Sequence, residues 1–368
     1  MRRLIIGFAS VLVCLTIGVL ASTWWSARRL HVRQSHTTVT VPDFRVSAQK
    51  LFPVRVNGKW GCINDSGKLV IEPKFENSTC SVDGPMPAEV NGKHGYINQA
   101  AAVVIAPQFD YAEDFSEGLA VAQKGKCGYI NIRGEFVIKP QFDFCKAFSD
   151  GLAQVGTGGF YLFGYTLRRP KLGFINRIGQ FVIEPQFDDA TGFSDGLATV
   201  YVDGKSGCIN TSGQFVINLQ EKGIGRFSEG LATVWEGDRL GYINRSGQLV
   251  IASRFKQAGE FSEGLANVMD ESGKYGFIDR TGRFVVEPQF DWADNFSESM
   301  AVVMIDGKKG FIDKTGELII PPRYESADSF AHGLAMIGVG TGDGFTPYEN
   351  MKWGYIDKTG KYIWQPSQ

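Results

Sequence analysis

At its centre the chain reads Gly207-Cys208-Ile209-Asn210-Thr211-Ser212-Gly213-Gln214-Phe215-Val216-Ile217. The opening of this stretch, a glycine, usually an aromatic residue, an isoleucine and then Asn or Asp, recurs along the chain. The glycines that begin the copies are Gly61, Gly95, Gly128, Gly173, Gly207, Gly241, Gly276, Gly310 and Gly354. Successive glycines are 33 to 35 residues apart, except for two longer steps of 45 and 44 residues that end at Gly173 and Gly354. A fixed period in this range indicates a repeat architecture.

One repeat unit predicts three short strands joined by tight turns. Residues 197–202 read Leu-Ala-Thr-Val-Tyr-Val, which is rich in β-branched and aromatic residues and is typical of a strand. Residues 206–210 and 214–217 follow as two more strands, after turns at 203–205 and 211–213 that contain glycine. In the connector, residues 184–196, Pro185 is expected to end the third strand because proline cannot donate to a ladder. Phe187 and Phe193 are expected to fill the space between units.

The array is therefore expected to be all-β and to consist of about nine three-stranded antiparallel meanders over residues 51–366. A single meander cannot bury its own apolar face, so neighbouring units must stack. They could do so as an open twisted repeat array or as a closed β-propeller-like ring. Propellers usually have four to eight blades and are often closed by a blade shared between the termini. Nine whole units without a split unit favour the open array.

The pattern resembles the WG-repeat family, whose repeats are also called KWG repeats. The motifs that carry the resemblance are Gly58-Lys59-Trp60-Gly61-Cys62-Ile63-Asn64 and Lys352-Trp353-Gly354-Tyr355-Ile356-Asp357. It covers about residues 51–366, although most units replace the tryptophan that gives the family its name. The resemblance implies an all-β repeat module of a kind found mainly in bacterial proteins. It implies no particular reaction and no catalytic residues.

The N-terminal residues differ from the rest of the chain. Two arginines precede an uncharged apolar run from Leu4 to Ser22, and Trp24 and Trp25 follow it. A run of this length can span a bilayer, and tryptophans favour the membrane interface. We therefore expect a transmembrane helix in residues 1–27, in the membrane through residues 4–25, with a cleaved signal peptide as the second interpretation. Residues 28–50 are polar and are expected to form a flexible tether. This organisation predicts a membrane-anchored protein with a periplasmic or otherwise extracytoplasmic domain, or, as the second choice, a secreted one.

Charge and cysteine content narrow the classes of function. The 368 residues carry a formal net charge of -1, which argues against a nucleic-acid partner. Four cysteines beyond the tether replace ordinary packing residues of the repeat: Cys62, Cys127, Cys145 and Cys208. We expect them to be buried small side chains rather than a disulfide framework or a metal cluster. A bridge made by the fifth, Cys80, is left open.

The two long steps of the repeat locate two insertions, residues 156–171 and 338–352. Both enter between the first and second strands of their unit, so both should project from the same edge of the array. Extra loops on one face of a repeat protein often form its binding face, whereas the alternative is a neutral hairpin extension. The candidate binding residues in these loops are Phe160, Tyr161, Tyr165, Arg168, Arg169, Phe345 and Tyr348.

A second candidate binding surface lies in the first strand of each unit. Its side chains alternate between two faces, and the face of Ala198 and Val200 barely changes between units, which predicts a core face. The opposite face varies and places Tyr201, Trp235, Met269 and Met304 at one equivalent position in four consecutive units. Such a strip could recognise a glycan or an extended peptide. The alternative is that these side chains pack between units.

No motif predicts catalysis. Carboxylates recur at fixed positions, as in Asp110, Asp143, Asp188 and Asp291, which indicates capping and turn roles because a catalytic pair should be unique. The four histidines lack the spacing of a metal site, and we expect neither a metal nor another cofactor. The sequence favours a membrane-tethered, non-enzymatic binding or scaffold module facing the cell envelope, with a protein or cell-wall glycan as its partner. The alternatives are a hydrolase-type enzyme with a site at the two inserted loops and a purely structural spacer.

Overall fold

The computed structural model describes residues 50–78, 80, 84–162, 165–340 and 351–367. By its internal contacts the chain divides into residues 1–44, which lie outside the described residues, and residues 45–368. The described part of the second unit contains β-strands and no helix, so nothing in it has the length and apolarity to cross a membrane as a helix. The expected transmembrane run at residues 4–25 lies outside the described residues.

The described strands form nine antiparallel sheets, which we number as blades 1 to 9, and one additional hairpin. Blade 1 contains β1 (Leu51–Val56), β2 (Lys59–Asn64) and β3 (Leu69–Phe75). Blade 2 contains β4 (Asn77–Ser78), β5 (Met86–Val90), β6 (Lys93–Ile97) and β7 (Val103–Phe109). Blade 3 contains β8 (Tyr111–Ala112), β9 (Ala120–Lys124), β10 (Lys126–Ile130) and β11 (Phe136–Phe142). Blade 4 contains β12 (Phe144–Cys145), β13 (Ala153–Thr157), β16 (Lys171–Ile175) and β17 (Phe181–Phe187), with the hairpin β14 (Phe160–Leu162) and β15 (Tyr165–Arg168) inserted.

The second half of the chain continues the series. Blade 5 contains β18 (Asp189–Ala190), β19 (Leu197–Val202), β20 (Lys205–Asn210) and β21 (Phe215–Gln220), and blade 6 contains β22 (Leu231–Glu236), β23 (Arg239–Asn244) and β24 (Leu249–Phe255). Blade 7 contains β25 (Gln257–Ala258), β26 (Leu265–Met269), β27 (Tyr275–Asp279) and β28 (Phe284–Phe290). Blade 8 contains β29 (Trp292–Ala293), β30 (Met300–Ile305), β31 (Lys308–Asp313) and β32 (Leu318–Tyr324). Blade 9 contains β33 (Ser326–Ala327), β34 (Leu334–Val339), β35 (Lys352–Asp357) and β36 (Tyr362–Ser367).

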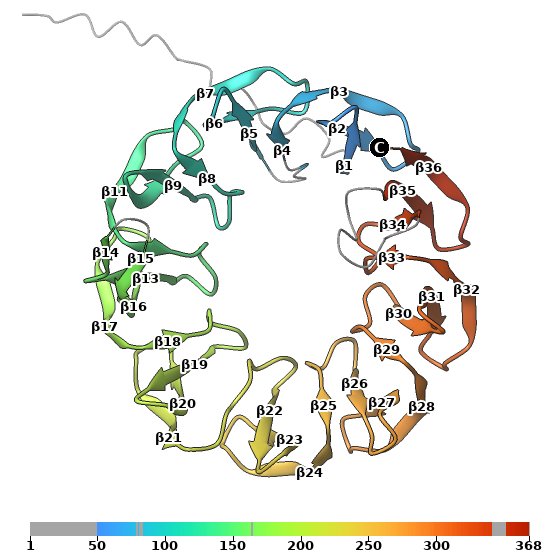
Figure 1. Cartoon of the computed structure of the whole chain (residues 1–368). Coiled ribbons are helices and arrows are strands. Elements are labelled where there is room, and N and C mark those ends of the chain that lie inside the picture. The colour runs from blue at the N-terminus through green and yellow to red at the C-terminus, as the bar shows by residue number, and fades with distance from the viewer. Residues whose placement is uncertain (1–49, 79, 81–83, 163–164, 341–350, 368) are drawn as a thin grey trace, which may run out of the picture. The chain divides into compact units, whose positions relative to one another are not determined.

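Each regular blade is the predicted three-stranded meander with a short strand added from the connector before it. In blade 5 the order is β18-β19-β20-β21, and Leu197 pairs with Asn210 while Val202 pairs with Lys205. The short strands lie on the inner side of the ring, and the third long strands, such as β7, β17 and β32, form its perimeter (Figure 1). Blade 6 has no short strand of its own, and in its place an isolated bridge pairs Ile224 of the connector with Val234 of β22.

The repeat glycines have the two roles that the sequence predicts. Gly213, in the turn between β20 and β21, has a φ of 82°, which favours glycine. Gly207 opens β20 where β21 passes very close, and a Cβ there would lie 2.7 Å from the carbonyl oxygen of Ile217.

The prediction that Pro185 ends its strand is wrong. β17 continues through this residue to Phe187, and its pairing with β16 jumps from Ile183 opposite Phe174 to Phe187 opposite Leu172. This irregularity takes Pro185 out of the regular ladder. Because β17 is an edge strand on the perimeter, a residue without an N–H is tolerated there.

The hydrophobic core lies between blades. The cluster between blades 4 and 5 joins Phe187 of the perimeter strand β17 to Phe193 and Val200 of the next blade. Phe187 and Phe193 are buried there, and the rings of Phe174 and Phe193 lie 4.8 Å apart, as predicted for side chains that fill the space between units. Every blade thus covers the apolar face of its neighbour, as expected for repeats that cannot bury it alone.

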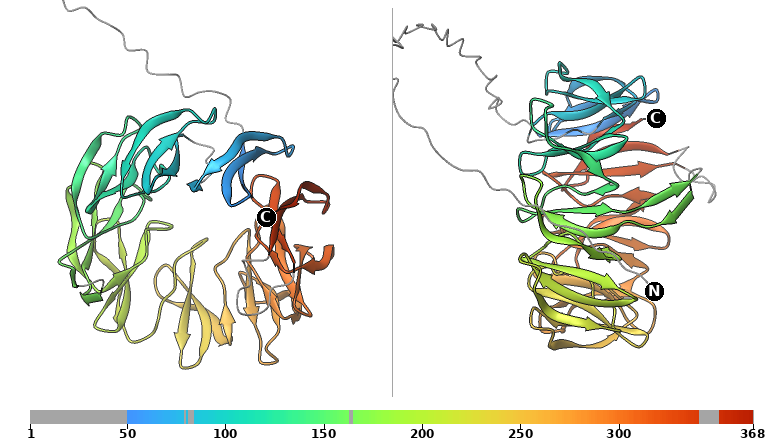
Figure 2. Two further views of the ribbon diagram at one scale, coloured as in Figure 1. Left: turned by 45° about the horizontal axis from the view of Figure 1, so that its top comes forward. Right: turned by 90° about the vertical axis from the view of Figure 1, so that its left-hand side faces the viewer.

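The array closes into a ring, so the prediction of an open twisted array is wrong and the β-propeller-like alternative is correct. The core clusters fall one at each of the nine junctions between described blades, and the ninth joins Phe52 and Val54 of blade 1 to Leu334 and Tyr355 of blade 9. The hydroxyl of Tyr355 donates to the carbonyl oxygen of Pro53 at 2.8 Å. Figures 1 and 2 show blades 1 and 9 side by side.

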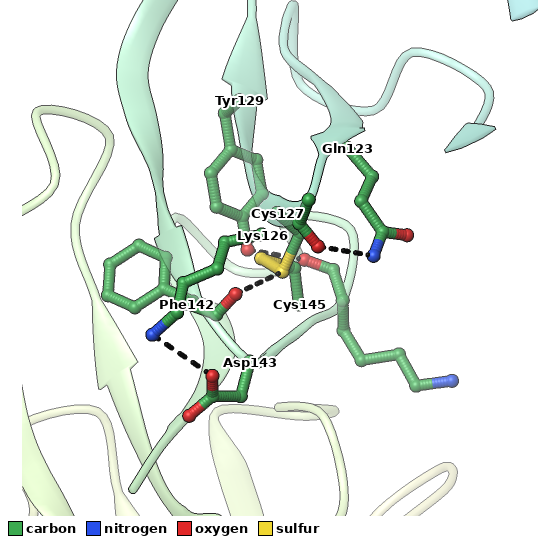
Figure 3. The surroundings of a disulfide bond; sticks show 9 residues. Gln123, Lys126, Cys127, Tyr129, Phe142, Asp143 and Cys145 are labelled. Atoms are coloured by element: carbon green, nitrogen blue, oxygen red, sulfur yellow. Dashed lines mark hydrogen bonds and ion pairs between the residues drawn. A yellow bond between two sulfur atoms is a disulfide. The ribbon is translucent and has the colours of Figure 1, made fainter. Parts of the chain in front are cut away.

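Two disulfides also join neighbouring blades, which corrects the prediction that the cysteines are only packing residues. Cys62 of blade 1 is bonded to Cys80, beside the short strand of blade 2, and Cys127 of blade 3 is bonded to Cys145 of blade 4. Figure 3 shows the second bond beside the Lys126–Asp143 ion pair. In each disulfide, the two cysteines occupy repeat positions that face each other across the joint between two blades. Cysteine at both positions therefore allows a cross-link to form. Cys208 is the exception and is a free buried thiol, as predicted.

Candidate functional site

The ring has two edges, which the strand directions define. We call the edge with the turns between the first and second long strands, such as residues 203–204 between β19 and β20, the insertion edge. We call the opposite edge, with the turns between the second and third long strands, such as residues 211–213, the entry edge. The hairpin β14–β15 leaves blade 4 at the insertion edge and projects from the ring (Figure 2). The second insertion leaves from the same edge, because Val339 and Lys352, which flank it, are paired across the end of β34 and β35.

The four residues of the predicted strip occupy one register position near the insertion edge. Each lies in the first long strand, opposite the residue that precedes the repeat glycine: Tyr201 opposite Ser206, Trp235 opposite Leu240, Met269 opposite Tyr275 and Met304 opposite Lys309. They belong to blades 5, 6, 7 and 8, which are consecutive around the ring. The structure therefore places the four side chains on one arc of the insertion edge.

Exposure differs along this arc. The Trp235 side chain is 41% exposed, whereas Tyr201, Met269 and Met304 are half-buried. The hydroxyl of Tyr201 donates to the carbonyl oxygen of Ile224 in the next blade at 2.9 Å. Tyr201 thus helps to join two blades, and Trp235 offers the largest accessible apolar surface of the four.

Two residues earlier in each strand, the variable face is a joint between blades. Thr199 is buried and donates to the carbonyl oxygen of Gly225 in blade 6 at 2.8 Å. Asn267 is buried and donates to the carbonyl oxygen of Ala293 in blade 8 at 2.7 Å. In these two strands the variable face is therefore buried at this position and more exposed toward its insertion-edge end.

The structure adds two aromatic residues to the arc that sequence reasoning missed. Trp292, in the short strand β29, is paired with Met304, and the Lys309 ammonium lies 4.8 Å from the centre of its ring. Tyr275 is paired with Met269. Both are half-buried. For Trp292 the missing signal was the connector, whose residues join the sheet as an inner strand and so come beside the first long strand. Tyr275 lies in the second long strand β27 and comes beside Met269 through the pairing of the two long strands.

The loop candidates are placed less completely. Phe160, Tyr161 and Tyr165 lie in the hairpin β14–β15, where the structure describes the backbone. Arg168 and Arg169 are exposed, and the Arg168 Nε donates to the carbonyl oxygen of Gly158 at 2.7 Å, across the base of the hairpin. Phe345 and Tyr348 lie outside the described residues.

The recurring aspartates act as caps, as predicted, and they also join neighbouring blades. Asp188 lies between blades 4 and 5, where its Oδ1 accepts from Lys171 and its Oδ2 accepts from the Asp203 N–H at 2.8 Å. The hydrogen bond from Lys171 and then that from the Asp203 N–H hold the pKa of the Asp188 carboxyl below its usual value. Asp110 and Asp291 make the same pair of contacts, and their pKa values are lowered for the same reasons.

Within the described ranges, no group of three or more His, Cys, Asp or Glu side chains is arranged to hold a metal ion. The one free thiol in that part of the chain, Cys208, contacts the Thr199 hydroxyl at 3.7 Å. Burial raises the pKa of the Cys208 thiol to about 11, so it stays protonated at neutral pH. A protonated buried thiol is a poor nucleophile.

The model of the WG containing repeat matches residues 60–93, 95–126, 128–159, 173–205, 207–238, 241–275, 275–308 and 310–340. The chain belongs to the WG-repeat family. The eight matches correspond to nine blades because β1 precedes the first match and β35 and β36 follow the last. This confirms the resemblance that the repeated motifs indicate.

Comparison with one solved structure supports the fold of this WG-repeat protein. A structure described as that of the eukaryotic initiation factor matches with a TM-score of 0.59 and 12% identity, over 86% of this chain and 95% of that chain. BamB from Moraxella catarrhalis matches with a TM-score of 0.41 and 11% identity, over 74% of this chain and 90% of that chain. No curated protein matches the sequence. At 12% identity the likeness to the initiation factor concerns the fold alone.

Proposed function

We propose that this WG-repeat protein is a non-enzymatic binding scaffold that presents the insertion edge of its ring to a protein or a cell-wall glycan. The observation that carries the proposal is Trp235, which is 41% exposed in the middle of the arc formed by Tyr201, Met269 and Met304. Exposed aromatic residues act as anchors at binding surfaces. The neighbouring aromatics Tyr275 and Trp292 extend the same surface.

We further propose that the ring is tethered to a membrane and faces the extracytoplasmic side. Residues 4–25 supply an apolar run with interfacial tryptophans, and residues 28–50 supply the tether. The two disulfides between blades support the compartment, because such bonds persist in oxidising environments and are rare in the cytosol.

The binding proposal is tested with the full-length protein and two probes, isolated cell-wall glycan and a membrane-protein extract. The expected result is retention of one probe, with retention reduced at least about tenfold by Trp235→Ala because a central aromatic anchor is lost. Phe215→Ala is the matched control: Phe215 is 42% exposed, but it lies at the start of the perimeter strand β21, beside the entry edge. Equal retention by Trp235→Ala and the wild type would refute the proposed binding surface.

A further inference from the structure

Two turns at the entry edge carry an exposed isoleucine, and one of the two, Ile178, stands where other blades carry a hydroxyl. Ile178 is 69% exposed at the turn between β16 and β17, and Ile132 is 38% exposed at the turn between β10 and β11. At the position of Ile178, six other turns have Ser or Thr, whose hydroxyl donates to the Asn or Asp that opens the turn: Ser66, Ser212, Ser246, Thr281, Thr315 and Thr359. Blade 4 thus lacks a local hydrogen bond and exposes an apolar side chain instead. Nothing in the packing of the ring explains that exchange.

Apolar side chains are exposed at the start of the perimeter strand in most blades, and these two turns add to them over blades 3 and 4. Each turn packs on the perimeter strand of the preceding blade: a Cβ at Gly134 would lie 2.7 Å from the side chain of Ile105 in β7, and a Cβ at Gly179 would lie 3.1 Å from that of Ile138 in β11. The same perimeter strands expose Val103 at 57% and Val137 at 46%. We define the entry-edge patch as Val103, Val104, Ile132, Val137, Ile178 and Val182.

The chain enters the ring at the same edge. Leu51, the first residue of β1, pairs with Asn64, the residue that opens the turn between β2 and β3. The tether, residues 28–50, therefore leads to the entry edge of blade 1, next to blade 2. Its 23 residues span at most about 80 Å when extended and about 27 Å on average when flexible. A bilayer holding residues 4–25 would thus be presented to the entry edge at high effective concentration.

We propose that the entry-edge patch docks on the lipid surface in which the N-terminal apolar run is anchored. The inference rests on the proposed tethering. Ile132 and Ile178 would enter the boundary between headgroups and acyl chains, while the exposed Arg133 beside Ile132 stays among anionic headgroups. Separate apolar tips on neighbouring turns suit a deformable bilayer, which accepts side chains without a matching groove. Docking would hold the entry edge of blades 2 to 4 against the membrane and direct the insertion edge of these blades outward.

The test uses the full-length chain with a protease site in the tether after Ser35. The protein is reconstituted in vesicles of phosphatidylethanolamine and phosphatidylglycerol, and flotation shows first whether the chain is anchored. The tether is then cut, and the fraction of released ring that floats with the vesicles is measured. The wild-type ring is expected to remain bound, whereas the double variant Ile132→Ser/Ile178→Ser is expected to bind at least about tenfold more weakly, because two apolar side chains no longer leave water.

Controls separate docking from folding and from anchoring. Ile178→Ser restores the hydroxyl found in six sibling turns, so the thermal midpoint is expected not to fall. Ile319→Ser is the matched control: it removes an isoleucine that is 41% exposed on the perimeter strand β32 of blade 8, outside the patch, and should bind as the wild type does. If the uncut chain floats but the cut wild-type ring is released as completely as the double variant, the docking inference is wrong and the tethering stands. If the uncut chain does not float, both the docking inference and the proposed tethering are wrong.

Discussion

At the scale of single residues, the ring reuses a few repeat positions as joints between blades. The tyrosine of the second long strand donates to a backbone carbonyl of the next blade, as Tyr129 does to Lys146 at 2.9 Å and Tyr242 does to Gly259 at 2.8 Å. The acidic residue of the connector turn accepts from an N–H of the next connector, as Glu298 does from Gly333 at 2.9 Å. Trp235 lies in the first long strand and occupies neither of these two positions.

Trp235→Ala separates the binding role of this residue from a packing role. Because the side chain is 41% exposed, we expect the unfolding free energy to fall by less than about 2 kcal/mol, well below the ~3–5 kcal/mol typical of a buried large aromatic. The measurement is a urea titration of the variant beside the wild type. A loss of ~3 kcal/mol or more would mean that Trp235 holds blades together, and the binding surface would then have to lie in the inserted loops.

The capping aspartates predict a loss of stability in acid. The folded pKa of Asp188 is depressed, so its stabilising contribution is fully present above the unfolded pKa of about 3.9 and is lost as pH falls through the lower folded value. Urea midpoints measured from pH 6 down to pH 2 should therefore fall most steeply below about pH 4. Asp188→Asn should flatten this fall, although modestly because the carboxylate is largely exposed. Glu184→Gln, which removes the charge of an exposed carboxylate in β17, is the control for the loss of one negative charge.

At the scale of strands and turns, the sequence predicts most of what the structure shows. Turn glycines and alternating apolar residues are local signals, and they correctly place the three long strands of each blade and the insertion between β13 and β16. The errors concern pairs of residues brought together by stacking. Cys127 and Cys145 each read as ordinary packing residues, because their contact exists only when blade 4 lies against blade 3. One signal was available, since both disulfides join cysteines 18 residues apart.

The disulfide between blades 3 and 4 predicts a local loss of stability on its removal. In the chain-entropy model, closing a loop of this length stabilises the folded state by about 3 kcal/mol. Cys127→Ala/Cys145→Ala should therefore lower the unfolding free energy by roughly that amount and speed hydrogen exchange first in β9, β10 and β13. Cys208→Ala removes a buried thiol without breaking a disulfide, so it should lower the unfolding free energy much less. Equal losses in the two variants would show that packing rather than the cross-link matters at this joint.

At the scale of the whole molecule, closure depends on the small rotation between successive blades. No single unit encodes that rotation, because it is a property of the joint between two units. The period of the sequence predicts nine units, but it does not predict that these units close into a ring. The sequence also does not predict at which edge the chain enters the ring. The register of β1 indicates the entry edge only once the structure shows that equivalent turns of the blades lie on one edge.

Ring closure makes its own prediction, because it joins residues that are 302 positions apart in the sequence. Tyr355→Phe keeps the aromatic side chain but leaves the carbonyl oxygen of Pro53 without its hydroxyl donor. This loss should lower the free energy of unfolding by about 1 kcal/mol. In a closed ring, hydrogen exchange should then quicken in β1 and β2 of blade 1 as well as in blade 9. Tyr242→Phe removes the matching bond at the joint between blades 6 and 7, and its effect should stay in those two blades because repeat stability is local. If Tyr355→Phe left the exchange of β1 unchanged, blades 1 and 9 would not be joined in solution, and the chain would behave as an open array.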